Sequence, residues 1–220
     1  MQKLTLCLLL LCNGVLCNTA AADLIFDNPT AITIVDDDIA NPYPSTISVS
    51  GVSGVISEIT VTLSNISHTY PDDIAAVVVS PTGDASLLFS GPGGGQNISN
   101  VTWTFDDSAM LTLPDTGQLV SGTFRPGQEE YDDFFPAPGP GGKLVDSDPA
   151  PWQFDFGHWI GDDPNGDWNL FILDANPGDA GSIAGGWSIN VTTAVPEPGC
   201  GVILLGLVAL AGRRRARDDR

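Results

Sequence analysis

Short segments rich in Val, Ile, Thr and aromatic residues recur along the chain, separated by Gly, Pro, Asn and Asp. Such segments are typical of β-strands, because branched and aromatic side chains pack well on a pleated surface and the separating residues favour turns. No stretch of residues 23–195 keeps helical periodicity over three turns. The pattern predicts an all-β sandwich, with strands over residues 31–35, 46–51, 55–66, 74–80, 85–90, 100–105, 167–174 and 187–193.

Two local signals refine this prediction. Segment 55–66 alternates apolar and polar residues but changes phase once near Glu58 and Ile59, which predicts a β-bulge. The stretch Ser-Pro-Thr-Gly at Ser80–Gly83 predicts a hairpin, because proline fixes φ and glycine accepts a positive φ. Residues 124–160 are crowded with Pro and Gly, and we expect them to form an irregular surface excursion across one end of the sandwich.

The N-terminal residues 1–22 have the features of a secretory signal peptide. Lys3 is followed by an apolar run, and Ala20 and Ala22 provide the small-x-small pattern of a cleavage site after Ala22. All four cysteines lie outside residues 23–194. An exported body without disulfides is held together by its core or by bound metal. We therefore expect one exported domain over residues 23–194.

The C-terminal segment 195–220 combines an apolar run with a cluster of arginines. Residues 199–212 carry no charge, and at helical rise they span ~21 Å, less than the ~30 Å hydrocarbon core of a bilayer. They predict a short transmembrane helix with the arginines on the cytoplasmic side. The order of the segment resembles the bacterial PEP-CTERM sorting signal, through Pro196, Glu197, Pro198, Arg213, Arg214 and Arg215. The resemblance implies processing by the membrane protease exosortase and a place at the cell surface or in the exopolysaccharide matrix.

The body is strongly acidic. Residues 23–195 contain 24 Asp and Glu but only Arg125 and Lys143 as basic residues, a net charge of 2 − 24 = −22. Such a charge repels nucleic acid and anionic lipid heads and attracts divalent cations. Nucleic acid is therefore excluded as a partner.

Three stretches resemble the P domain, also called Homo B, the β-jelly-roll domain that follows the catalytic domain of proprotein convertases and kexins. They are ITVTLSNISHTYPDDIAAVVVSPTGDASLLF, NVTWTFDD and DDPNGDWNLFILDANPGDAGSIAGGWSINV. The positions that match are His68, Asp73, Ser80, Pro81, Gly83, Asn165, Gly166, Trp168, Leu170, Asp174, Gly181, Gly186, Trp187 and Ile189. Asp72, Ile74 and Asp84 depart from the usual residues of the family. The resemblance implies a jelly-roll sandwich over the whole exported body.

Calcium is the cofactor that this resemblance and the charge favour. Asp and Asn side chains and backbone carbonyls are the oxygen ligands that calcium prefers, and the acidic loops supply many of them. The family's calcium sites lie among such loops, so the candidate ligands are Asp72, Asp73, Asp106, Asp163 and Asp174.

The sequence favours a non-catalytic module. His68 and His158 are the only histidines, neither lies in a recognisable protease motif, and no Gly-x-Ser-x-Gly stretch exists. We expect His68 to satisfy nearby backbone or a carboxylate at a strand end, and we expect Trp168 and Trp187 to be core residues. The expected work is interaction with a protein or a polysaccharide at the cell surface or in the extracellular matrix.

Three alternatives stay open. The first is an accessory domain related to subtilisin/kexin-type serine endopeptidases, and the second is a glycan hydrolase that uses two carboxylates. The third is a carbohydrate-binding module. In that case Trp152 and Trp159 are the natural stacking platforms if they are exposed, whereas burial of both favours simple packing.

Overall fold

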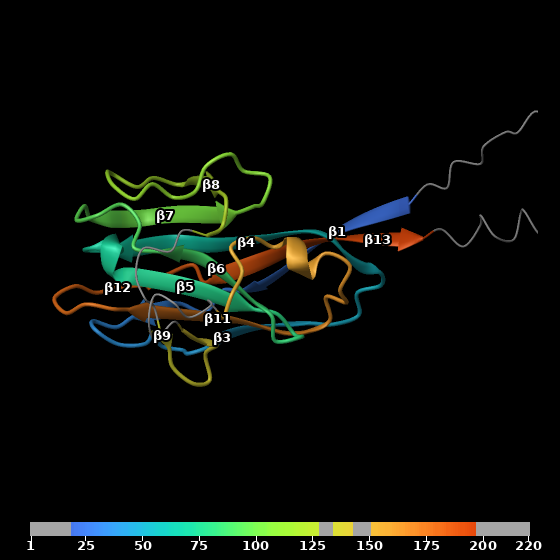
Figure 1. Cartoon of the computed structure of the whole chain (residues 1–220), viewed down its shortest axis with the longest axis horizontal. Helices are drawn as coiled ribbons and strands as arrows, with labels where there is room; N and C mark the ends of the chain where they lie inside the picture. The colour runs from blue at the N-terminus through green and yellow to red at the C-terminus, as the bar shows by residue number, and fades with distance from the viewer. Residues whose placement is uncertain (1–18, 128–133, 143–150, 197–220) are drawn as a thin grey trace, which may run out of the picture. The chain divides into compact units, whose positions relative to one another are not determined.

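The computed structural model describes residues 19–127, 134–142 and 151–196, which form β-strands and two short 3-10 helices (Figure 1). Ala21–Ala194 make one compact unit, which contains the sandwich. The chain ends, residues 1–20 and 195–220, group separately and lie almost entirely outside the described residues. The expected signal peptide, apart from Thr19–Ala22 at the start of the first strand, and the expected transmembrane helix are therefore not described.

The larger sheet is built around the longest strand, β4. Its strand order is β1-β13-β4-β12-β2. In addition, β7 pairs with β4, and β8 pairs with β7. Thr192 pairs with Glu58 and Thr193 with Ile56, so Ser57 is an extra residue in β4. The predicted β-bulge is confirmed within one residue. The strands are β1 (Thr19–Asn28), β2 (Ile32–Ile34), β4 (Val55–His68), β7 (Ile98–Phe105), β8 (Gly122–Phe124), β12 (Gly181–Ile183) and β13 (Trp187–Pro196).

The smaller sheet has the order β3-β11-β5-β6. The predicted hairpin joins its last two strands: Val79 lies opposite Ala85, and the Gly83 N–H donates to the Ser80 carbonyl at 3.0 Å. Gly83 has φ of +93°, which a residue with a Cβ rarely adopts. The strands are β3 (Ser45–Val49), β5 (Ile74–Val79), β6 (Ala85–Ser90) and β11 (Gly166–Asp174).

The main core lies between the two sheets and contains four fully buried tryptophans. Trp168 donates its Nε1–H to the Pro164 carbonyl at 2.9 Å, and Trp187 donates to Ser45 Oγ at 3.0 Å. A buried indole needs such a partner, so both residues pack without an unpaired polar atom. The prediction that Trp168 and Trp187 are core residues is confirmed.

A second apolar cluster lies on the outer face of the smaller sheet. In β5 the side chains alternate between the two clusters: Ala76 and Val78 face the main core, whereas Ala75 and Val77 face the second cluster. Phe135 and Trp152, both from the Pro- and Gly-rich excursion, cover this outer face together with Tyr43, as the position of β9 beside β11 in Figure 1 illustrates. We call residues 134–142 and 151–155, which belong to the excursion, the strap; they include β9 (Phe134–Phe135), which pairs with β10 (Gly141–Gly142).

The strap also closes the open edge of β6. The Leu87 N–H donates to the Gln153 carbonyl and the Gln153 N–H donates to the Ala85 carbonyl, both at 2.9 Å. Unpaired strand edges promote association with other chains, and this edge is occupied. The strap, which is one part of the expected excursion, crosses a sheet face because that face is apolar.

All eight predicted strands are present, and the all-β sandwich is confirmed. Five strands were not predicted: β1, β8, β9, β10 and β12. The last four have two or three residues each, too few to show a period of two. Within residues 19–127, 134–142 and 151–196, no helix is long and apolar enough to cross a membrane.

Candidate functional site

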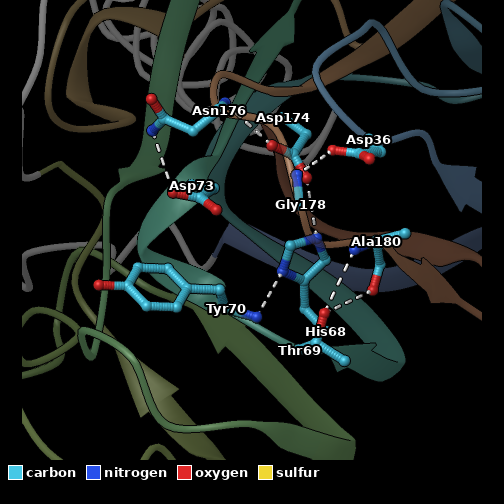
Figure 2. A network of polar contacts seen from close by, with 9 residues as sticks. All are labelled: Asp36, His68, Thr69, Tyr70, Asp73, Asp174, Asn176, Gly178 and Ala180. Atoms are coloured by element: carbon cyan, nitrogen blue, oxygen red, sulfur yellow. Dashed lines mark hydrogen bonds and ion pairs between the residues drawn. The ribbon is translucent and has the colours of Figure 1, made fainter.

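A buried polar network lies where β4, β5 and β11 end or begin (Figure 2). His68 is the last residue of β4, and Asp174 is the last residue of β11, opposite Ile74 at the start of β5. Gly181 of β12 pairs with His68, and a Cβ at Gly181 would collide with the Ser67 carbonyl and the imidazole ring. The glycine therefore lets β12 close over the histidine.

Both ring nitrogens of His68 are engaged inside the protein. Nε2 lies 3.1 Å from Asp174 Oδ2, and Nδ1 accepts the Tyr70 N–H at 3.2 Å. Because Nδ1 is an acceptor, the proton of the neutral ring lies on Nε2 and is donated to the carboxylate. His68 and Asp174 are only 2% and 3% exposed. The expectation that His68 satisfies backbone and a carboxylate at a strand end is confirmed.

Asn176 links the two buried carboxylates of the network. Its Nδ2 donates to Asp73 Oδ1 at 3.0 Å, and its backbone N–H donates to Asp174 Oδ1 at 3.1 Å. The Ala175 N–H donates to the Asp73 carbonyl at 2.8 Å. Figure 2 shows Asn176 joined by a dashed line to each of the two aspartates. These bonds fix the loop after β11 onto the 3-10 helix Pro71–Asp73.

The electrostatics of this end are unfavourable to ionised carboxylates. Burial raises the pKa of Asp174, partly offset by the Asn176 N–H and by His68. Burial also raises the pKa of Asp73, and the charges of Asp179 and Asp72 add to that rise. The network thus holds a histidine and two carboxylates together away from solvent.

The five candidate calcium ligands divide between two ends of the sandwich. Asp72 and Asp73 lie in the 3-10 helix, and Asp73 and Asp174 are bridged by Asn176. Asp106 directly follows β7, and the first residue of β7, Ile98, pairs with His68. Because β7 has eight residues and a strand rises ~3.3 Å per residue, its two ends are ~25 Å apart. Asp106 therefore lies far from the His68 end. Asp163 similarly precedes β11, which ends at Asp174. Asp163 caps its own loop by accepting the Asn165 N–H at 2.9 Å.

One calcium ion cannot contact all five predicted ligands, because of this separation. In the described part of the chain, no three His, Cys, Asp or Glu side chains are grouped so as to hold a metal ion. Of the five, Asp73 and Asp174 are joined through Asn176, and Asp72 is the sequence neighbour of Asp73.

The two candidate stacking tryptophans are buried. Trp152 is 2% exposed and packs edge-on against Phe135, and Trp159 is fully buried between Phe156 and Trp168. A sugar stacks on an aromatic face that solvent can reach, so the stacking prediction is wrong for both residues in this structure. Burial of both tryptophans favours a role in packing, as expected above for buried side chains.

The sorting motif lies at the limit of the described residues. Pro196 is the last residue of β13, whereas Glu197, Pro198, Arg213, Arg214 and Arg215 lie outside the described residues. The sorting-signal interpretation therefore stays a prediction.

Asn176 was missed by sequence reasoning, although it lies in the acidic stretch DANPGD. The pairing of His68 with Asp174 was also missed, because the two residues are 106 positions apart. An Asx pattern such as Asp-x-Asn after a strand is the one signal that indicates a capped loop there.

The chain matches no protein-family model and no curated protein. Among solved structures it is similar to a chain in the complex of the Aeromonas sobria serine protease with its chaperone, with 13% identity and a TM-score of 0.39 over 81% of this chain. It is also similar to the serine protease of Aeromonas sobria alone, with 12% identity and a TM-score of 0.36 over 80% of this chain. The aligned part spans 27% of the matched chain in both cases. Scores below 0.5 assign neither a fold nor a function to this chain.

Proposed function

We propose that the protein is a non-catalytic, exported interaction module of the P-domain type, a jelly-roll sandwich that binds a protein or polysaccharide at the cell surface or in the extracellular matrix. The observation that carries this proposal is the sealed His68–Asp174 pair, in which both imidazole nitrogens have internal partners. A histidine-carboxylate pair of this kind normally draws attention as catalytic machinery. Here it joins two strand ends.

The experiment separates binding from turnover. The purified full-length chain is incubated with casein and with a panel of soluble polysaccharides, and both product release and retention on the immobilised substrates are measured. We expect retention on one or more ligands with no product above the level of heat-inactivated protein. Product release that disappears in His68→Gln would contradict the non-catalytic role and support a hydrolase.

Calcium stabilisation is a second part of the proposal, placed at the His68 end. Asp73 and Asp174 supply the carboxylates there, and the raised pKa of each indicates that a nearby cation would relieve an unfavourable charge. A ligand that binds only the folded state raises its melting temperature. We expect a higher midpoint in millimolar calcium than in chelator, and a smaller difference in Asp73→Asn. Equal midpoints would remove calcium from the proposal.

Export and sorting rest on the two chain ends. We propose that the signal peptide exports the body and that exosortase processes the Pro196–Glu197–Pro198 tail. Deleting residues 195–220 should release the body into the medium, whereas the intact chain fractionates with the envelope or the matrix. Identical fractionation of the two forms would contradict the sorting role.

A further inference from the structure

An apolar groove with a carboxylate rim lies at the end of the sandwich opposite His68. Its volume is about 320 Å³. The 48% exposed Ile160 and, beneath it, the buried Ile59 and Phe156 line it with apolar atoms, and Glu58, Asp106 and Asp107 provide the carboxylates. We call it the bulge groove, because it lies beside the β-bulge of β4.

The bulge is the reason that Glu58 faces this groove. In a regular strand neighbouring side chains point to opposite faces, but the extra residue Ser57 interrupts that alternation. Ser57 and Glu58 are both exposed, between the buried Ile56 and Ile59. The Ser57 hydroxyl donates to the Thr192 carbonyl at 3.0 Å and so fixes the bulge.

The two aspartates of the rim are held by backbone N–H groups and not by cations. Both oxygens of Asp107 accept the Phe156 N–H, at 3.0 and 2.9 Å, and Asp106 Oδ1 accepts the Ser108 N–H at 2.7 Å. In the part of the chain that the structure describes, the one ion pair is His68–Asp174, at the other end. Partial burial and the charges of Asp155 and Asp106 raise the pKa of Asp107, so a positive charge near it is favourable.

Beside the groove, β4 has an open edge. β7 pairs with β4 only from Val61 onward, and the loop after Trp159 bonds to Ile56 through the Gly161 N–H and the Asp162 carbonyl. Between these points, no strand of the described ranges pairs with residues 57–60 on that side. An extended peptide can lie along such an edge.

From these features we infer that the bulge groove binds a lysine or arginine side chain carried by an extended segment of a partner protein. The aliphatic stem packs on Ile59, Phe156 and Ile160, and the charged head group reaches the carboxylate rim. A cationic side chain of a protein fits better than a cationic lipid surface, because a groove of about 320 Å³ accommodates one aliphatic side chain and its charged end. The inference rests on the proposed role as an interaction module and names the chemistry of its partner.

Calorimetric titration of the purified full-length chain tests the inference with seven-residue Thr/Val peptides. The central residue is arginine, lysine or citrulline, the last being a neutral analogue of arginine. We expect the arginine and lysine peptides to bind, and the citrulline peptide to bind about tenfold more weakly or not at all, which is the loss of one charge-assisted contact. Raising NaCl from 50 to 300 mM should weaken the charged peptides only.

Matched variants distinguish binding at the groove from nonspecific attraction to the negative charge of the body. Glu58→Gln and Asp107→Asn should each weaken arginine-peptide binding about tenfold. Asp115→Asn, which removes the same charge from an exposed position outside the groove, should bind as the unaltered chain does. Glu58→Gln keeps the test valid if Asp107→Asn unfolds, since Glu58 is exposed on the bulge.

Three results would overturn the inference: equal binding of the citrulline and arginine peptides, groove variants that bind like the Asp115→Asn control, or binding of free spermine without binding of any peptide. These results are distinct from failure of the proposed function. Peptides that bind the groove and are cleaved contradict the non-catalytic role alone. Retention on polysaccharide without any peptide binding contradicts the groove inference alone.

Discussion

Asp174 stabilises the sandwich by accepting two hydrogen bonds in a buried position, from His68 Nε2–H and from the Asn176 N–H. Asp174→Ala leaves the buried His68 Nε2–H without a partner and removes the acceptor of the Asn176 N–H, and we expect a loss of about 3 kcal/mol in the free energy of unfolding. Denaturant unfolding measures this loss. The control is Asp115→Ala, which removes an exposed carboxylate and should cost less than about 0.5 kcal/mol. Equal midpoints for the two variants would contradict the structural role of the pair.

The raised pKa values of three aspartates also predict how stability depends on pH; they are Asp73, Asp107 and Asp174. The folded-state pKa of each is raised by burial, so just above the ordinary value of about 4 the folded chain binds more protons than the unfolded chain. Stability should therefore fall as pH rises from about 4 through the raised values, and then level off. Asp163, whose pKa is lowered, has the opposite sign, but it is fully exposed and contributes little.

Melting curves between pH 4 and pH 8 test this dependence. We expect the highest midpoint at the acid end of this range and a flatter profile in the double variant Asp73→Asn, Asp174→Asn. A midpoint that increases steadily toward pH 8 would show that these carboxylates are stabilised, not strained, by their surroundings.

At the scale of elements, the strap is the part whose contribution is easiest to isolate. Trp152→Ala removes a side chain that is 2% exposed and leaves a cavity beside Phe135, so we expect a loss of about 3 kcal/mol and increased binding of a hydrophobic dye. Phe154→Ala is the matched control, because Phe154 is an aromatic residue of the same segment with 41% exposure. If both variants unfold at the same denaturant concentration, the strap does not stabilise the smaller sheet.

The elements also show what sequence can and cannot predict. The hairpin at Ser80–Gly83 and the bulge beside Glu58 were predictable because each depends on a few consecutive residues. The course of the strap was not, since Trp152 packs in a cluster with Leu87 and Val77, which lie 65 or more residues earlier. The same limit applies to the site: Asp73 and Asp174 were predicted as calcium ligands among the acidic stretches, but only the fold brings them together through Asn176.

For the whole molecule, the dominant feature is the net charge of −22 on residues 23–195. Self-repulsion opposes a compact state, and dissolved salt screens it. We expect the melting temperature to rise, on the order of 3 °C, when sodium chloride is increased from 50 to 500 mM. Potassium chloride serves as the control for a specific effect of sodium. An unchanged melting temperature would mean that the carboxylates are spaced too far apart to destabilise the fold.

The pairing of distant strands sets the order in which this chain can be completed. Thr46 bonds to Asn169, 123 residues later, and Ser45 accepts the indole N–H of Trp187, 142 residues later. In the smaller sheet β11 lies between β3 and β5. During synthesis these two strands therefore lack their common partner until residue 174 has been made. Folds dominated by such remote contacts form slowly and only near the end of synthesis. A chain that is still unfolded when its last strands appear is in the state that a secretion channel accepts.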